Sequence, residues 1–190
     1  MKYHDIPYGP VPCRASGRGH AEAITRQLGR GPLGGGMALF LSTFVNKVDK
    51  KGRVSVPASF RAALAGQSFA GIVAFRSFKS PALDACGIDW MERLAQSLDN
   101  LALFSTEHDD LAASTLADSR QLPFDGDGRI VLPADLAQHA KISDRAAFVG
   151  RGPMFQIWNP EAFERFQDEA RARVQKAGAT LRLNPQGGGS

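Results

Sequence analysis

An aspartate and an arginine four positions apart, with a glycine just before the arginine, occur twice in this chain of 190 residues. The first pair is Asp49 and Arg53, and the second is Asp125 and Arg129. Across a turn, the carboxylate can accept hydrogen bonds from turn amides and also hold the guanidinium in one orientation. An arginine fixed in this way is suited to bidentate contacts with phosphate or guanine. The alternative is a hairpin turn closed by a surface ion pair, without any ligand.

The repetition extends beyond the two pairs, because residues 49–58 and 125–134 are identical at five of ten positions. One small unit therefore occurs twice. The second copy has Gly126 and Asp127 where the first has two lysines. The region of the first turn holds one acid, Asp49, and five basic residues: Lys47, Lys50, Lys51, Arg53 and Arg61. Since a phosphate backbone attracts cations and repels acids, the first turn is the expected nucleic-acid contact and the second is expected to be structural.

The overall charge says less about partners than this local cluster does. The net charge is +4, and residues 1–36 alone carry five basic and two acidic groups. The sequence has no apolar run of about 18 residues, so no membrane span is expected. Its two cysteines, Cys13 and Cys86, fit neither a disulfide framework nor a metal site. We expect them to be reduced thiols in a cytosolic protein.

The two ends of the chain differ from its middle. Residues 1–36 contain several prolines and a triple glycine without sustained periodicity, so a disordered leader is expected. Met37 follows the glycines directly, and we hypothesise that translation naturally starts there. Residues 178–190 are expected to form a disordered tail.

Hydrophobic patterns between these ends predict the order β-turn-β-α-β-β-α, twice. The expected strands are residues 39–48, 54–56, 69–78, 82–86, 122–124, 130–132, 146–150 and 154–158. The expected helices are residues 58–64, 88–102, 106–118, 134–139 and a last one with Phe163, Phe166, Ala170 and Val174 on one face. This pattern divides the chain into a first domain (residues 37–87), a helical connection (88–118) and a second domain (119–177). Because a unit of about 60–70 residues is marginally stable alone, we expect an intramolecular pseudo-dimer.

The repeat also resembles a known family. The opening from Met37 to Phe40 that leads to residues 49–57 resembles MraZ proteins, as do residues 125–133 and the stretch Phe155–Trp158 followed by Phe163. The resemblance covers roughly residues 37–175. It implies a mixed α+β, β-rich fold in which two tandem swapped-hairpin units of the AbrB/SpoVT type form a pseudo-dimeric β-barrel with flanking helices. It also implies rings of many subunits.

The same resemblance implies a function. MraZ proteins are bacterial transcriptional regulators, usually repressors, of the division and cell-wall gene cluster, and they bind direct repeats in double-stranded DNA upstream of their own operon. Carried over, the DNA contacts are Lys51 and Arg53, with Asp49 as support and Lys50 as a secondary candidate. The expected location is the cytoplasm, at the nucleoid. No cofactor, metal or small-molecule effector is expected.

Three other functions remain open. An enzyme could use the cluster from Glu107 to Asp110, which includes His108, for metal binding or acid–base chemistry. It has no second histidine or cysteine at ligand spacing, so a solvated helix start is the preferred interpretation. An antitoxin-like module would combine DNA binding with a toxin-binding tail, but the tail after Gly178 is short and poor in apolar anchors. An oligomeric scaffold without DNA is the third alternative.

Overall fold

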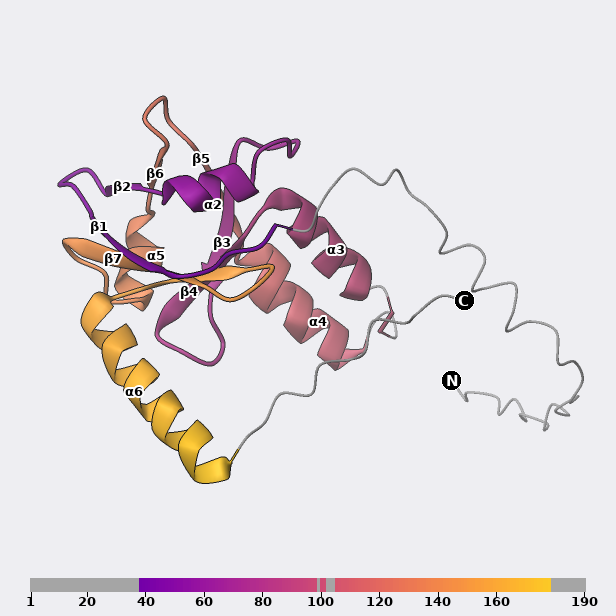
Figure 1. Cartoon of the computed structure of the whole chain (residues 1–190). Coiled ribbons are helices and arrows are strands. Elements are labelled where there is room, and N and C mark those ends of the chain that lie inside the picture. Colours follow the sequence, from indigo (N-terminus) through magenta and orange to yellow (C-terminus); the bar gives the residue numbers. More distant parts are fainter. Residues whose placement is uncertain (1–37, 99, 102–104, 179–190) are drawn as a thin grey trace, which may run out of the picture. The chain divides into compact units, whose positions relative to one another are not determined.

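The computed structural model describes residues 38–98, 100–101 and 105–178 (Figure 1). The predictions for the leader, for Cys13 and for the tail beyond Gly178 lie outside these residues. Within the described part of the chain, no helix is long and apolar enough to cross a membrane.

The predicted order of helices and strands is confirmed. The strands are β1 (Thr43–Lys47), β2 (Arg53–Ser55), β3 (Gly71–Arg76), β4 (Ala82–Cys86), β5 (Arg120–Pro123), β6 (Arg129–Val131), β7 (Arg145–Gly150) and β8 (Phe155–Trp158). The helices are α2 (Ala58–Ala63), α3 (Ile88–Leu98), α4 (Thr106–Ala112), a π-helical turn η1 (Ala113–Ala117), α5 (Ala134–His139) and α6 (Pro160–Ala177). The first strand is shorter than predicted because Ser42 has φ +72°, which interrupts the extended chain between Phe40 and Thr43.

Six strands form one sheet in the order β1-β7-β8-β4-β3-β5, and every neighbouring pair is antiparallel. The order is symmetric between the two halves of the chain. If β1, β3 and β4 are exchanged for β5, β7 and β8, the same order results, read from the other edge. The remaining strands, β2 and β6, pair with each other. The expected mixed α+β fold is therefore confirmed, and each half of the chain supplies an edge strand to the hairpin of the other.

The closed barrel expected from the family resemblance is wrong for the described residues. The sheet is open, with β1 and β5 at its two edges. Strands β2 and β6 do not bridge these edges, because each has only three residues and a proline that cannot donate to a ladder lies two positions beyond its end. A single bridge, from Val48 to Val54, links the end of β1 to β2.

The sheet is covered on both faces. Side chains on one face join α2, α5 and the pair of β2 and β6 in the main core, which includes Phe60, Ile130, Leu136, Phe148 and Phe155. On the other face, α3 covers β3 and β4 through Met91, and α6 covers β7 and β8 through Phe163. The alternation of side chains along each strand explains this division, since Leu83 and Ala85 enter the main core while Ala82 and Cys86 face the helices.

Candidate nucleic-acid interface

The first loop, residues 49–52, is organised around one carboxylate. Oδ1 of Asp49 accepts the backbone N–H groups of Lys51 at 2.8 Å and Arg53 at 2.9 Å. Its Oδ2 accepts the Nε–H of Arg53 at 2.7 Å. Gly52 adopts φ +75°, a conformation that favours glycine. The predicted turn geometry, with the guanidinium held by the aspartate, is present.

The second loop, residues 125–128, repeats this arrangement and adds one contact. Asp125 accepts the backbone N–H groups of Asp127 at 3.0 Å and Arg129 at 2.9 Å, and the Nε–H of Arg129 at 2.8 Å. Asp127 also pairs with Nη2 of Arg129 at 2.7 Å. By contrast, the terminal nitrogens of Arg53 form no hydrogen bond or ion pair with any residue that the structure describes. The two arginines therefore differ in how much of their donor capacity is free.

Hydrogen bonding keeps both loop aspartates ionised. The backbone N–H of Arg53 is the largest cause that lowers the pKa of Asp49, to about 2, and the Arg53 side chain adds to it. The pKa of Asp125 is lowered for the corresponding reason, by the backbone and then the side chain of Arg129. The hydrogen bond to Asp125 raises the pKa of Arg129. At neutral pH each loop thus holds a charged aspartate–arginine pair.

The ribbon, by which we mean the paired strands β2 and β6, brings the two motifs together. Arg53 lies opposite Val131, and Ser55 lies opposite Arg129. Between them, Val54 and Ile130 point into the main core and are almost completely buried. The two arginines therefore stand at diagonal corners of the outer face of the ribbon, together with Ser55 and Val131, which is 57% exposed. This long-range pairing was not predicted, because β2 and β6 are short and lie far apart in the sequence.

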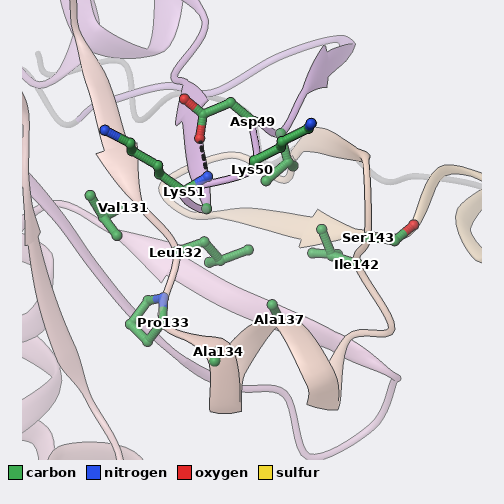
Figure 2. Close-up of a pocket in the computed structure, with 12 residues that line it drawn as sticks. Asp49, Lys50, Lys51, Val131, Leu132, Pro133, Ala134, Ala137, Ile142 and Ser143 are labelled. Atoms are coloured by element: carbon green, nitrogen blue, oxygen red, sulfur yellow. Dashed lines mark hydrogen bonds between the residues drawn. The ribbon is translucent and has the colours of Figure 1, made fainter.

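Beneath the first loop lies a cleft of about 550 Å³, which we call the first cleft (Figure 2). Its walls come from both halves of the chain. In Figure 2, Leu132 and Ile142 lie between the loop and α5, and Ala137 faces the loop from α5 itself. In Figure 2, the side chains of Lys50 and Lys51 extend to opposite sides of the loop. No pattern in the sequence predicts this cleft, since its floor belongs to the second half.

The second cleft, beneath the second loop, is smaller, at about 260 Å³, and Arg61 lines it. The Nε of Arg61 donates to the carbonyl of Val56 at 3.2 Å, and its guanidinium lies against Gly128. Grouping Arg61 with the first loop was therefore wrong. The interleaving of the two halves places α2, which carries Arg61, under the loop of the other copy.

The residues proposed for an enzyme form a helix start, as preferred. Ser105 caps α4 by accepting the N–H of His108 at 3.1 Å, and Glu107 and Asp109 lie in the first turn. Acids at this position are stabilised by the helix dipole. Among the residues that the structure describes, no three metal-binding side chains are grouped. Cys86 is buried, and this burial raises the pKa of its thiol to about 12, so the thiolate is not populated at neutral pH.

Known proteins similar to this chain agree on one family. A family model described as "MraZ protein, putative antitoxin-like" matches residues 116–184. A protein of Pelagibacter ubique named Transcriptional regulator MraZ is 46% identical over 144 residues, which cover 76% of this chain and 93% of that protein. Proteins of the same name from Rickettsia bellii and Rickettsia akari are 44% and 43% identical, and each is covered to 98% of its length. With this identity over nearly the whole length of its relatives, the chain belongs to the MraZ family.

Proposed function

We propose that this protein is a DNA-binding transcriptional repressor that acts on the operon containing its own gene, within the division and cell-wall gene cluster. The observation that carries the proposal is the state of Arg53. Its guanidinium is oriented by Asp49 at 2.7 Å, its terminal nitrogens have no partner among the described residues, and Lys50 and Lys51 adjoin it. A fixed planar fork beside free ammonium groups suits a phosphate backbone and the edge of a guanine.

The outer face of the ribbon is the proposed contact surface. The major groove of B-DNA, about 12 Å wide, admits a two-stranded ribbon of this kind. Arg53 would enter the groove while Lys51, and secondarily Lys50, contact the flanking phosphates. Arg129 lies on the same face, but Asp125 and Asp127 hold its charge at 2.8 and 2.7 Å. We therefore assign the main DNA contact to the first loop and a structural role to the second.

The interleaved strands support an arrangement of two tandem swapped-hairpin units, residues 37–87 and 119–177, with residues 88–118 as their connection. Copies of the chain would assemble into a homo-oligomeric ring at the nucleoid, in the cytoplasm. One ribbon with a few phosphate contacts binds DNA weakly. Adjacent ribbons on adjacent direct repeats would increase the affinity through effective concentration, provided that their spacings match.

A mobility-shift experiment tests this function directly. The full-length protein is titrated into DNA from upstream of its own gene and into a scrambled DNA of the same composition, at 50 and 200 mM salt. We expect preferential binding to the upstream DNA that weakens as salt rises. Equal affinity for both DNAs would refute sequence-specific regulation and leave the oligomeric scaffold as the better function.

The family description gives one reason to keep a second candidate, an antitoxin-like module, because it contains the words "antitoxin-like". Such a protein would bind a small toxin in addition to DNA. Purification of the complex from its native host, followed by mass spectrometry, tests this candidate. A stoichiometric small partner encoded next to the gene would favour it over the autonomous repressor.

A further inference from the structure

The first cleft has the size and lining of a small-molecule site. Its volume of about 550 Å³ falls within the range of about 300–1,000 Å³ typical of ligand pockets. The floor is apolar, since Leu132 and Ile142 are 4% and 8% exposed and the half-buried Ala137 lies beside them on α5.

The rim of the first cleft carries uncompensated positive charge. The side chains of Lys50 and Lys51 form no ion pair with any residue in the described part of the chain. Among the described residues that line the cleft, only Asp49 carries a carboxylate, and both of its oxygens are already engaged by Arg53 and the loop amides. An anion placed here gains attraction to an ammonium group without displacing an existing partner.

We propose that the first cleft binds a small amphipathic carboxylate, whose apolar body lies on Leu132, Ala137 and Ile142 and whose carboxylate pairs with Lys50 or Lys51 at the rim. Bound there, it lowers the affinity for DNA, because the neutralised lysine no longer contacts a phosphate. The binding of the carboxylate stands on the geometry of the cleft alone. Its effect on DNA rests on the proposed function.

The second cleft serves as an internal comparison. Position 61 in the first copy corresponds to position 137 in the second, at the repeat spacing of 76 residues. Arg61 thus occupies the space that the small Ala137 leaves open, and the second cleft has less than half the volume of the first. Its loop also has Gly126 and Asp127 in place of the two lysines. The same fold therefore offers one cleft that suits an anion and one that does not.

Octanoate is the probe, and calorimetric titration into the full-length protein without DNA is the first measurement. We expect saturable binding that weakens between 50 and 200 mM salt, with octanamide, which lacks the charge, and inorganic phosphate, which lacks the apolar body, both at least tenfold weaker. Ala137→Phe, which fills the first cleft, should lower octanoate affinity at least tenfold. The matched control Ala65→Phe, in the exposed wall of the second cleft, should leave octanoate affinity unchanged.

A second variant guards against loss of folding in Ala137→Phe. Lys50→Gln combined with Lys51→Gln changes two exposed side chains, and it should abolish the salt dependence of octanoate binding. Absence of octanoate binding to wild type, or binding of octanamide as tight as that of octanoate, would overturn the proposal. So would wild-type octanoate affinity in folded Ala137→Phe or in the folded double lysine variant.

Fluorescence anisotropy with the upstream DNA then separates the two parts of the inference. Saturating octanoate should lower DNA affinity about fivefold at 0.15 M salt. This is the loss expected for one phosphate contact, because affinity falls with roughly the 0.9 power of salt concentration for each contact. Unchanged DNA affinity with octanoate bound would overturn the regulatory part. A protein that binds octanoate but has no preference for the upstream DNA would instead contradict the proposed function, while the cleft would stand.

Discussion

Replacing Arg53 with alanine tests the central contact. In the structure, Asp49 fixes the Nε of Arg53 at 2.7 Å and leaves the terminal nitrogens to reach a ligand. The loss of one positive charge near the DNA lowers affinity about fivefold at 0.15 M salt, because affinity falls with roughly the 0.9 power of salt concentration for each charge. A bidentate contact with guanine adds about 5- to 150-fold. We therefore expect Arg53→Ala to lower affinity for the upstream DNA roughly 25- to 750-fold.

Arg129→Ala is the matched control, because Arg129 has the same place in the second motif and on the ribbon. Two carboxylates, from Asp125 and Asp127, already engage its guanidinium. We expect Arg129→Ala to lower DNA affinity no more than about fivefold, the effect of losing one positive charge near the DNA. Its main effect should be a lower thermal midpoint, since removing Arg129 leaves two neighbouring carboxylates unpaired.

The assay is fluorescence anisotropy with labelled upstream DNA at several salt concentrations, with circular dichroism to confirm that each variant is folded. Arg53→Lys completes the series, because it keeps the charge but removes the planar fork. It should retain the salt dependence of wild type and lose the preference over scrambled DNA. Equal losses of affinity in Arg53→Ala and Arg129→Ala, both folded, would refute the division of roles between the two loops.

Three further predictions concern the loops. Asp127→Lys removes one partner of Arg129 and gives the second loop a lysine, as in the first, so anisotropy should show tighter DNA binding and a salt slope steeper by about one to two. Gly52→Ala should lower the free energy of unfolding by about 1–2 kcal/mol in urea denaturation, because φ is +75° and the new methyl would lie 3.1 Å from the carbonyl oxygen of Leu132. The pKa of Asp49 is lowered from 3.8 to about 2, so the stabilisation from its ionised form is complete above pH 3.8 and disappears as pH falls through about 2. Carboxyl-carbon NMR should therefore show the Asp49 midpoint near 2; a midpoint near 3.8 would contradict the hydrogen-bonded loop.

The features that could be predicted from sequence are those carried by neighbouring residues. The Asp49–Arg53 turn spans only four peptide bonds and includes a glycine with positive φ, so its geometry follows from the local sequence. The bounds of β4 and α5 agree with prediction for the same reason, because their apolar patterns end at clear breaks.

The features that were missed depend on which distant segments meet. The pairing of Val54 with Ile130 is set by the fit of two three-residue strands into the shared core, and no local signal encodes it. That pairing moves Arg61 under the second loop and places Leu132 and Ile142 under the first. The open sheet has the same origin, since the ribbon satisfies its own hydrogen bonds instead of closing the edges. A repeat found in the sequence thus predicts the two units but not which strands of one unit pair with strands of the other.

The interleaving also separates the electrostatics of the two loops. Around the second loop, Arg61 and Arg129 face Asp125 and Asp127, so two positive charges meet two negative ones. Around the first loop, Lys50, Lys51 and Arg53 face the single acid Asp49, which leaves an excess of two positive charges. Like charges held together oppose folding, and an anion that binds only the folded loop relieves this repulsion. The first loop should therefore be the place where DNA or a carboxylate stabilises the protein.

The thermal midpoint should rise with either ligand in wild type and respond less in the variant with Lys50→Gln and Lys51→Gln. An equal response in both proteins would show that the excess charge is not what the ligands recognise.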